Sequence, residues 1–265
     1  MKKRLFRICL LMLVLACSVT YLSAEQPDTI RIMPIGDSLT QANDPGYRGY
    51  LYRLLKQSGI QFDFVGSKHD TVGEAEYDTD HSGFAGYTIG PGASLRDNDD
   101  PCHQGNILFH LDEGYKLLSS KPDVILLMIG INDFFNNRDT MRYNPEVAGA
   151  EHLDNLIYHI SRILPECTIL VSNITPLRGS EHFAELYNSQ VEGIVSKYRE
   201  QSFPYYFVDM RSGIDWNLEK DLGPDNLHPA ASGYEKIAER FFKILNTLYL
   251  AGELNCKKNN NNEGI

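Results

Sequence analysis

Short apolar runs alternate with longer amphipathic stretches along most of this chain, and this alternation limits the folds open to it. The apolar runs are rich in branched and aromatic residues and cover 30–35, 62–66, 124–129, 168–174 and 205–208. Strands that are buried on both faces of a parallel sheet have this composition. The helical candidates are 48–57, 105–119, 145–164, 183–201 and 231–249. The pattern predicts a three-layer α/β/α sandwich around a five-stranded parallel, doubly wound sheet of the flavodoxin-like kind.

The two ends of the chain differ from this body. Residues 1–24 begin with lysines and arginines, continue with an apolar run and end in small residues, which predicts a cleaved signal peptide and therefore an exported protein. The apolar run is shorter than the ~20 residues of a membrane span, so no transmembrane segment is expected. We predict one domain over 25–252 and a disordered tail over 253–265, where the asparagine run lies.

Cysteine usage leaves one alternative open at the N-terminus. Cys17 follows Val14, Leu15 and Ala16, an arrangement that loosely resembles the box of lipidated bacterial proteins. Leu15 fits that box poorly, so cleavage near Ala24 is favoured over a lipid anchor at Cys17. The three remaining cysteines allow at most one internal disulfide and do not form a disulfide scaffold; they are Cys102, Cys167 and Cys256.

The charge of the chain argues against nucleic acid as a partner. The formal net charge is −10, and it becomes −14 once the four basic residues of 1–24 are removed. An acidic protein of this kind repels phosphate backbones. A neutral or acidic external polymer is a better candidate partner.

Three polar motifs follow predicted strands. The segment 36–38 (Gly-Asp-Ser) follows the first strand, 130–133 (Gly-Ile-Asn-Asp) follows the third, and 225–228 (Asp-Asn-Leu-His) follows the fifth after a loop. Ligands of doubly wound folds bind at the carboxyl ends of the strands, so we expect these motifs to form one site. The stretch 67–104 has few periodic apolar residues and is predicted to be an extended functional loop.

These residue types fit nucleophilic acyl transfer. A serine hydroxyl needs a base, and imidazole suits that task near neutral pH, so Ser38 is the candidate nucleophile and His228 the candidate base. Asp225 is placed to accept the other ring N–H of His228 and to fix its tautomer. The Ser38 N–H and the Asn132 side-chain amide are candidate oxyanion donors. Taken singly, Asp37 with Ser38 could cap a helix, and Asn132 with Asp133 could form a turn. His228 could likewise be a surface histidine before a helix, with Asp225 as a solvated loop carboxylate. Together these readings require three coincidences at one rim, so a single site is favoured.

The chain is identified by these motifs as similar to the SGNH, or GDSL-type, hydrolase superfamily. Its four sequence blocks are matched in order, by 36–39, a glycine within 83–88, 130–133, and Asp225 with His228. The resemblance implies a serine hydrolase, and it implies Gly86 as a third oxyanion donor. Gly83 and Gly90 are close competitors, but Gly86 is followed by Tyr87 and Thr88, as in the family pattern of glycine, aromatic and threonine.

Within that superfamily the chain resembles carbohydrate esterase family three, which includes acetylxylan esterases. The similar segments are 31–40, 46–55, 63–67, 81–88 and 228–234. The resemblance implies a secreted esterase that removes O-acetyl groups from plant polysaccharide through an acyl-enzyme on Ser38. Two alternatives stay open: a lipolytic or thioesterase-type relative that acts on longer acyl esters, and a glycan-binding surface protein without turnover.

Acidic side chains elsewhere in the sequence offer oxygen atoms to a cation. They are Asp78, Asp80, Asp97, Asp99 and Asp100, with His81 beside them. Their spacing matches no EF-hand loop, and acidic loops are ordinarily solvated. We therefore expect neither a metal ion nor a cofactor.

Overall fold

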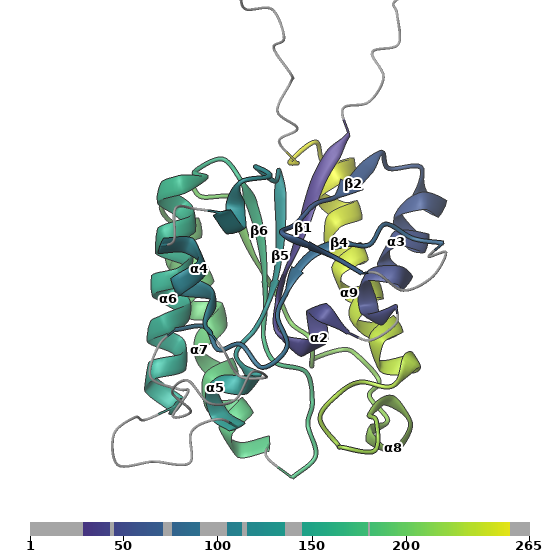
Figure 1. Ribbon diagram of the computed structural model, residues 1–265, viewed down its shortest axis with the longest axis vertical. Coiled ribbons are helices and arrows are strands. Elements are labelled where there is room, and N and C mark those ends of the chain that lie inside the picture. The colour runs from purple at the N-terminus through teal and green to yellow at the C-terminus, as the bar shows by residue number, and fades with distance from the viewer. Residues whose placement is uncertain are drawn as a thin grey trace, which may run out of the picture.

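The computed structural model describes residues 29–42, 45–70, 76–90, 105–112, 116–135, 145–179 and 181–254. A central sheet lies between two layers of helices (Figure 1). The helices α6 (Pro145–Ile163) and α7 (Glu181–Arg199) cover one face, while α3 (Gly46–Ser58) and α9 (Ala231–Leu250) cover the other. The predicted three-layer sandwich is confirmed. The predicted signal peptide, Cys17, Cys102 and Cys256 lie outside the described residues, as does 255–265 of the predicted tail.

All five predicted strands are present in the sheet. They are β1 (Ile30–Gly36), β2 (Phe62–Phe64), β5 (Val124–Met128), β6 (Thr168–Ser172) and β7 (Tyr205–Val208). Parallel pairing places them in the order β2-β1-β5-β6-β7. This is the flavodoxin-like order, in which the chain changes direction across the sheet between β1 and β5. Ligand sites of such folds lie at that switch point, next to the carboxyl ends of these two strands.

Two further strands correct the prediction for the stretch 67–104. The structure places β3 (Lys68–His69) and β4 (Asp80–Gly83) there, which makes the sheet seven-stranded. β4 runs parallel to the carboxyl end of β1 and β3 runs antiparallel to β4, so the sheet is mostly and not wholly parallel. Both strands are short and polar, and therefore lack the apolar pattern by which the other strands were recognised.

The predicted helices are also present with one exception, and the described part of the chain adds three short helices that were not predicted. The stretch 105–119 forms two short helices, α4 (Ile107–Asp112) and the 3₁₀ helix η1 (Lys116–Leu118), where a single helix was expected. Short helices lie at the end of the sheet to which β1 and β5 point, namely α2 (Ser38–Gln41), α5 (Ile131–Phe135) and α8 (Leu218–Asp221) (Figure 1). Among the described residues, no helix combines the length and the apolar character that crossing a membrane would need.

The sheet is the centre of the hydrophobic core. Every residue of β5 and β6 is buried, as expected for strands covered by helices on both faces. β1 and β5 approach each other closely, and this explains why β1 ends in a glycine, Gly36. A Cβ atom on Gly36 would lie 2.0 Å from the carbonyl oxygen of Met128 in β5. Only glycine fits there, and the chain after β1 therefore starts from a fixed point against β5.

Candidate functional site

The segment after β1 forms the one-turn helix α2, which begins with Ser38. Asp37 precedes it as the N-cap, and its carboxylate accepts the backbone N–H of Leu39 at 3.0 Å. An N-cap aspartate stabilises a helix start because it satisfies an amide that has no partner inside the helix. Asp37 is therefore the structural residue of the Asp-Ser pair. Its neighbour Ser38 stays partly exposed at the rim of the sheet.

The loop before α9 presents His228. One carboxylate oxygen of Asp225, Oδ1, accepts the backbone N–H groups of Leu227 and His228, both at 3.0 Å. The N–H of Gly223 donates to the carbonyl oxygen of His228 at 2.7 Å and closes the loop. Asn226 takes a left-handed backbone conformation at φ +61°, which asparagine tolerates better than most residues. The loop is thus fixed largely by its own polar groups.

Ser38, His228 and Asp225 lie in one hydrogen-bonded line. The Nε2 atom of His228 is 2.8 Å from the Ser38 hydroxyl oxygen, and its Nδ1 atom is 2.6 Å from Asp225 Oδ2. An ionised carboxylate only accepts hydrogen bonds, so Nδ1 carries the ring proton and Nε2 is left as the acceptor for the serine hydroxyl. The serine is thereby paired with a base in the tautomer that can remove its proton.

The charge of Asp225 is maintained although the residue is partly desolvated. Desolvation acts to raise the pKa of Asp225, but the hydrogen bonds from the His228 ring and from the amides of Leu227 and His228 outweigh it and lower that pKa below its ordinary value. The side chains of His228 and Asp225 are 39% and 52% exposed. The line is therefore open to solvent.

The candidate oxyanion donors lie at the same rim. Asn132, in the first turn of α5, donates its side-chain amide to the carbonyl oxygen of Tyr87 at 3.0 Å. Gly86 directly precedes Tyr87 and takes a positive φ of +79°, which suits glycine. The turn that contains Gly86 starts beside β1, since the N–H of Phe84 donates to the carbonyl oxygen of Gly36 at 2.9 Å. The structure thus joins Asn132 to the residue that follows Gly86 and joins the turn of Gly86 to the end of β1.

Two aspartates near the site, Asp37 and Asp133, are buried, and the sequence did not predict their burial. Asp133 is fully buried and accepts the N–H of Ile89 at 3.0 Å. Burial raises the pKa of Asp133, and it raises that of Asp37 to about 7 against the opposing hydrogen bond from Leu39. The nearby carboxyl group of Asp133 also raises the pKa of Asp37. Aspartates after a strand have no sequence signal that distinguishes such buried groups from solvated ones.

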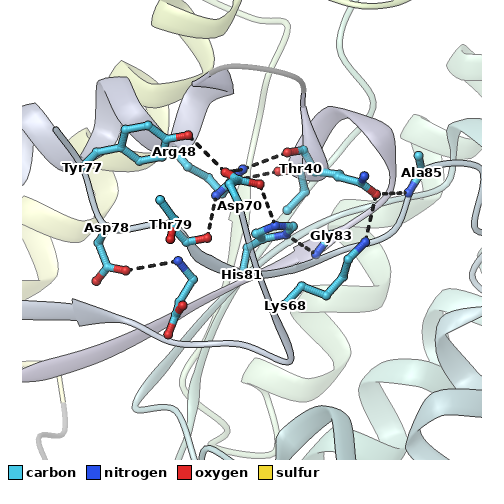
Figure 2. Close-up of polar contacts among 12 residues, drawn as sticks. Thr40, Arg48, Lys68, Asp70, Tyr77, Asp78, Thr79, His81, Gly83 and Ala85 are labelled. Carbon is cyan, nitrogen blue, oxygen red and sulfur yellow. Dashed lines mark hydrogen bonds and ion pairs between the residues drawn. The ribbon is translucent and has the colours of Figure 1, made fainter. Parts of the chain in front are cut away.

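A further polar network was missed by sequence reasoning. Arg48 of α3 is buried and is surrounded by Thr40, Asp70 and Thr79, which come from three different segments (Figure 2). An arginine in an amphipathic helix is usually solvated. Its burial follows here from tertiary packing, which the sequence does not display.

Asp78 and His81, considered above with the possible cation ligands, have other partners in the structure. Asp78 accepts the backbone N–H groups of Phe64 and Asp80, and both ring nitrogens of His81 are engaged by Asp70 and Gly83. In the part of the chain that the structure describes, no group of three or more histidine, cysteine, aspartate or glutamate side chains is arranged to hold a metal ion. Asp97, Asp99 and Asp100 lie outside that part.

Comparison with known proteins places this chain in a family. The model of the GDSL-like lipase/acylhydrolase family matches residues 32–241, so the chain belongs to that family. It is 30% identical over 230 residues to a multidomain esterase of Ruminococcus flavefaciens, in an alignment that covers 80% of this chain and 28% of that protein. The chain thus spans less than a third of this relative.

Solved structures show the same fold. A family 3 carbohydrate esterase of Clostridium thermocellum is 31% identical, with a TM-score of 0.66 and coverage of 84% of this chain and 98% of the other. A family 3 carbohydrate esterase from Talaromyces cellulolyticus, at 19% identity, has a TM-score of 0.65 and is covered over 99% of its length. The resemblance to family 3 carbohydrate esterases noted in the sequence is therefore confirmed.

Proposed function

We propose that this protein is a serine esterase that removes O-acetyl groups from an acetylated plant polysaccharide of the acetylxylan type. The observation that carries the proposal is the hydrogen-bonded line from Ser38 through His228 to Asp225, open to solvent at the carboxyl ends of β1 and β5. Similarity to family 3 carbohydrate esterases supports the carbohydrate ester as substrate. An exposed base and carboxylate suit a bulky polymer, which cannot enter a deep pocket.

The first half of the reaction acylates the serine. Ser38 Oγ attacks the ester carbonyl carbon while His228 Nε2 takes the hydroxyl proton, and Asp225 stabilises the imidazolium that forms. The negative charge that develops on the carbonyl oxygen is held by the N–H groups of Ser38 and Gly86 and by the Asn132 amide. That amide nitrogen carries two hydrogens, of which Tyr87 accepts one. The intermediate then breaks the bond to the sugar oxygen, which receives the proton from His228.

The second half releases acetate. A water molecule gives a proton to His228 Nε2 and attacks the acetyl carbonyl of Ser38 through the same oxyanion donors. The new intermediate breaks the bond to Ser38 Oγ, which takes back the proton from the imidazolium. Neither half requires a metal ion or a redox cofactor, since the triad and the oxyanion donors carry out both.

Export fits this function, since a plant polysaccharide is met outside the cell. Residues 1–24 have the order of charges and apolar residues of a signal peptide, and Cys17 offers a candidate lipid anchor. Mass spectrometry of the native N-terminus distinguishes cleavage after the signal peptide from lipidation of Cys17. A chain that begins near Glu25 supports cleavage after the signal, and a chain that begins with a lipid-bearing Cys17 supports the anchor.

The substrate is tested by acetate release from acetylated xylan, beside aryl esters of two to eight carbons, with wild type and Ser38→Ala. We expect acetate release that depends on Ser38 and falls steeply as the acyl chain lengthens. A preference for long acyl chains would move the function to lipid or thioester hydrolysis. Absence of serine-dependent hydrolysis on every ester would favour a glycan-binding protein without turnover.

A further inference from the structure

Outside the triad, the guanidinium group of Arg48 is a deeply buried cation, with its side chain only 1% exposed. Its Nη2 atom donates to Asp70 Oδ2 at 2.7 Å, and this ion pair compensates the cost of burying the charge. The same group donates to two backbone carbonyl oxygens, from Nε to Thr40 and from Nη2 to Gln41, both at 2.8 Å. These hydrogen bonds from a buried guanidinium group fix the backbone at Thr40 and Gln41.

The two carbonyl groups belong to the helix that carries the candidate nucleophile. Thr40 and Gln41 are the last residues of α2, and Ser38 is its first. The final carbonyl groups of a helix have no partner within the helix. Because α2 is only one turn long, Arg48 holds the orientation of the whole turn.

Hydrogen bonds connect this ion pair to the turn that contains Gly86, the candidate oxyanion donor. Asp70 Oδ1 is 3.1 Å from Nε2 of buried His81, whose Nδ1 accepts the N–H of Gly83 at 2.9 Å (Figure 2). Since Nδ1 is an acceptor, the ring proton is on Nε2 and is donated to Asp70. A continuous series of hydrogen bonds thus runs from the end of α2 to the end of β4, where the turn with Gly86 begins.

A second connection between α2 and this turn is more direct, because it runs through the side chain of Gln41. The side-chain oxygen of Gln41 accepts the backbone N–H of Ala85 at 2.8 Å and the ammonium group of Lys68 at 3.1 Å. Figure 2 shows Lys68 and Ala85 converging on one oxygen atom, and the Lys68 ammonium also lies 5.0 Å from the ring centre of Phe84. Ala85 directly precedes Gly86. A residue three positions after Ser38 therefore binds the amide next to the candidate oxyanion donor.

We propose that Gln41 is a positioning residue that sets the place of the Gly86 N–H relative to Ser38 Oγ, with Arg48 holding Gln41 from its backbone side; this inference rests on the proposed esterase function. An oxyanion donor must lie within about 2.7–3.1 Å of the developing charge. A displacement of about 1 Å costs on the order of 10²-fold in rate. Loss of the connection therefore acts on kcat, because substrate contacts in the ground state are untouched.

The test uses the acceptor character of Gln41. Its oxygen receives both hydrogen bonds, so Gln41→Glu keeps the acceptor whereas Gln41→Leu removes it at similar size. For hydrolysis of an aryl acetate we expect Gln41→Leu to lower kcat by about 10- to 100-fold with KM within about threefold, and Gln41→Glu to restore most of the rate. Gln61→Leu is the matched control, since Gln61 is exposed and belongs to the turn before β2.

Arg48 itself is unsuited to the test, because its loss would leave Asp70 as an unpaired charge and destabilise the fold. A thermal midpoint close to that of wild type shows that Gln41→Leu is folded. Lys68→Met serves as an independent variant that removes one of the two bonds to Gln41; it should lower kcat by a smaller factor.

Three results would overturn the inference. Gln41→Leu and Lys68→Met could both keep wild-type kcat, Gln41→Glu could lose as much rate as Gln41→Leu, or the loss could appear in KM alone. In each case wild type still hydrolyses the ester in a Ser38-dependent way, so the proposed function stands and only the positioning role fails. A wild type without Ser38-dependent hydrolysis overturns both.

Discussion

The substitution Asp225→Asn separates the charge of this side chain from its structural contacts. The Asn oxygen can still accept the amides of Leu227 and His228, which Asp225 Oδ1 accepts at 3.0 Å, so the loop before α9 keeps its shape. The Asn NH₂ group, however, faces His228 Nδ1, where the carboxylate accepted a hydrogen bond at 2.6 Å. The ring then favours the tautomer with its proton on Nε2, which cannot receive the proton of Ser38.

The size of the effect follows from these contacts. A hydrogen bond to a charged group contributes about 1.5–3 kcal/mol, and each 1.36 kcal/mol of barrier is a factor of about ten in rate. The tautomer change therefore costs about 10- to 10²-fold, and the lost stabilisation of the imidazolium adds a further factor. A buried triad loses about 10⁴-fold on the same substitution. Because Asp225 is 52% exposed, water replaces part of the lost interaction, and we expect a loss of about 10²- to 10³-fold in kcat.

The assay is steady-state hydrolysis of an aryl acetate near neutral pH, and Ser38→Ala gives the background rate. Asp215→Asn makes the same change of charge at an exposed position outside the triad and is the matched control. Asp225→Ala should lose at least as much activity and also lower the thermal midpoint, since both amide contacts disappear. If Asp225→Asn kept more than about a third of the wild-type kcat, Asp225 would not set the tautomer of His228.

Three further predictions concern the rim of the sheet. Asn132→Ala should lower kcat by about 10²- to 10³-fold, as removal of one oxyanion donor does, and an unchanged kcat would exclude Asn132 from that role. Burial raises the pKa of Asp37 from 3.8 to about 7, so the folded protein holds a proton that the unfolded chain releases, and stability falls as pH rises through that window. Asp37→Asn should therefore flatten the pH dependence of the free energy of unfolding in urea titrations. The same slope in wild type and variant would contradict the raised pKa of Asp37. Gly36→Ala should lower the free energy of unfolding by about 3 kcal/mol, because its Cβ would meet the Met128 carbonyl, and wild-type stability would show that β1 and β5 can separate there.

The sequence predicted those parts of the fold that leave a pattern in residue type. The strands β5 and β6 are buried throughout and read as continuous apolar runs, so their identity was clear. β4 is short and polar, and its place beside β1 depends on a pairing of two residues that no local pattern reports. The stretch 105–119 has enough apolar residues for one helix, yet tertiary packing divides it into α4 and η1.

The site was predictable to the extent that its chemistry requires particular residue types. Ser38, His228 and Asp225 follow from what acyl transfer needs, and the structure brings them within hydrogen-bond distance. Gly86 came from a family resemblance, because any of several glycines would satisfy the residue pattern. Gln41 and Arg48 were not predicted, since the contacts that join them to the site are to backbone groups of other segments, and backbone groups carry no sequence signal.

The central claim is that Ser38 is a nucleophile activated by His228. The most direct measurement is inactivation by an aryl phosphonate, followed by peptide mass spectrometry of the labelled protein. Ser38 Oγ should attack phosphorus and expel the aryloxide while His228 takes the hydroxyl proton, which leaves a stable phosphonyl ester on Ser38. We expect one label per chain and a parallel loss of hydrolysis, and His228→Ala should slow the labelling. A label on another residue that accounts for the lost activity, or full hydrolysis by a protein labelled at Ser38, would contradict the account.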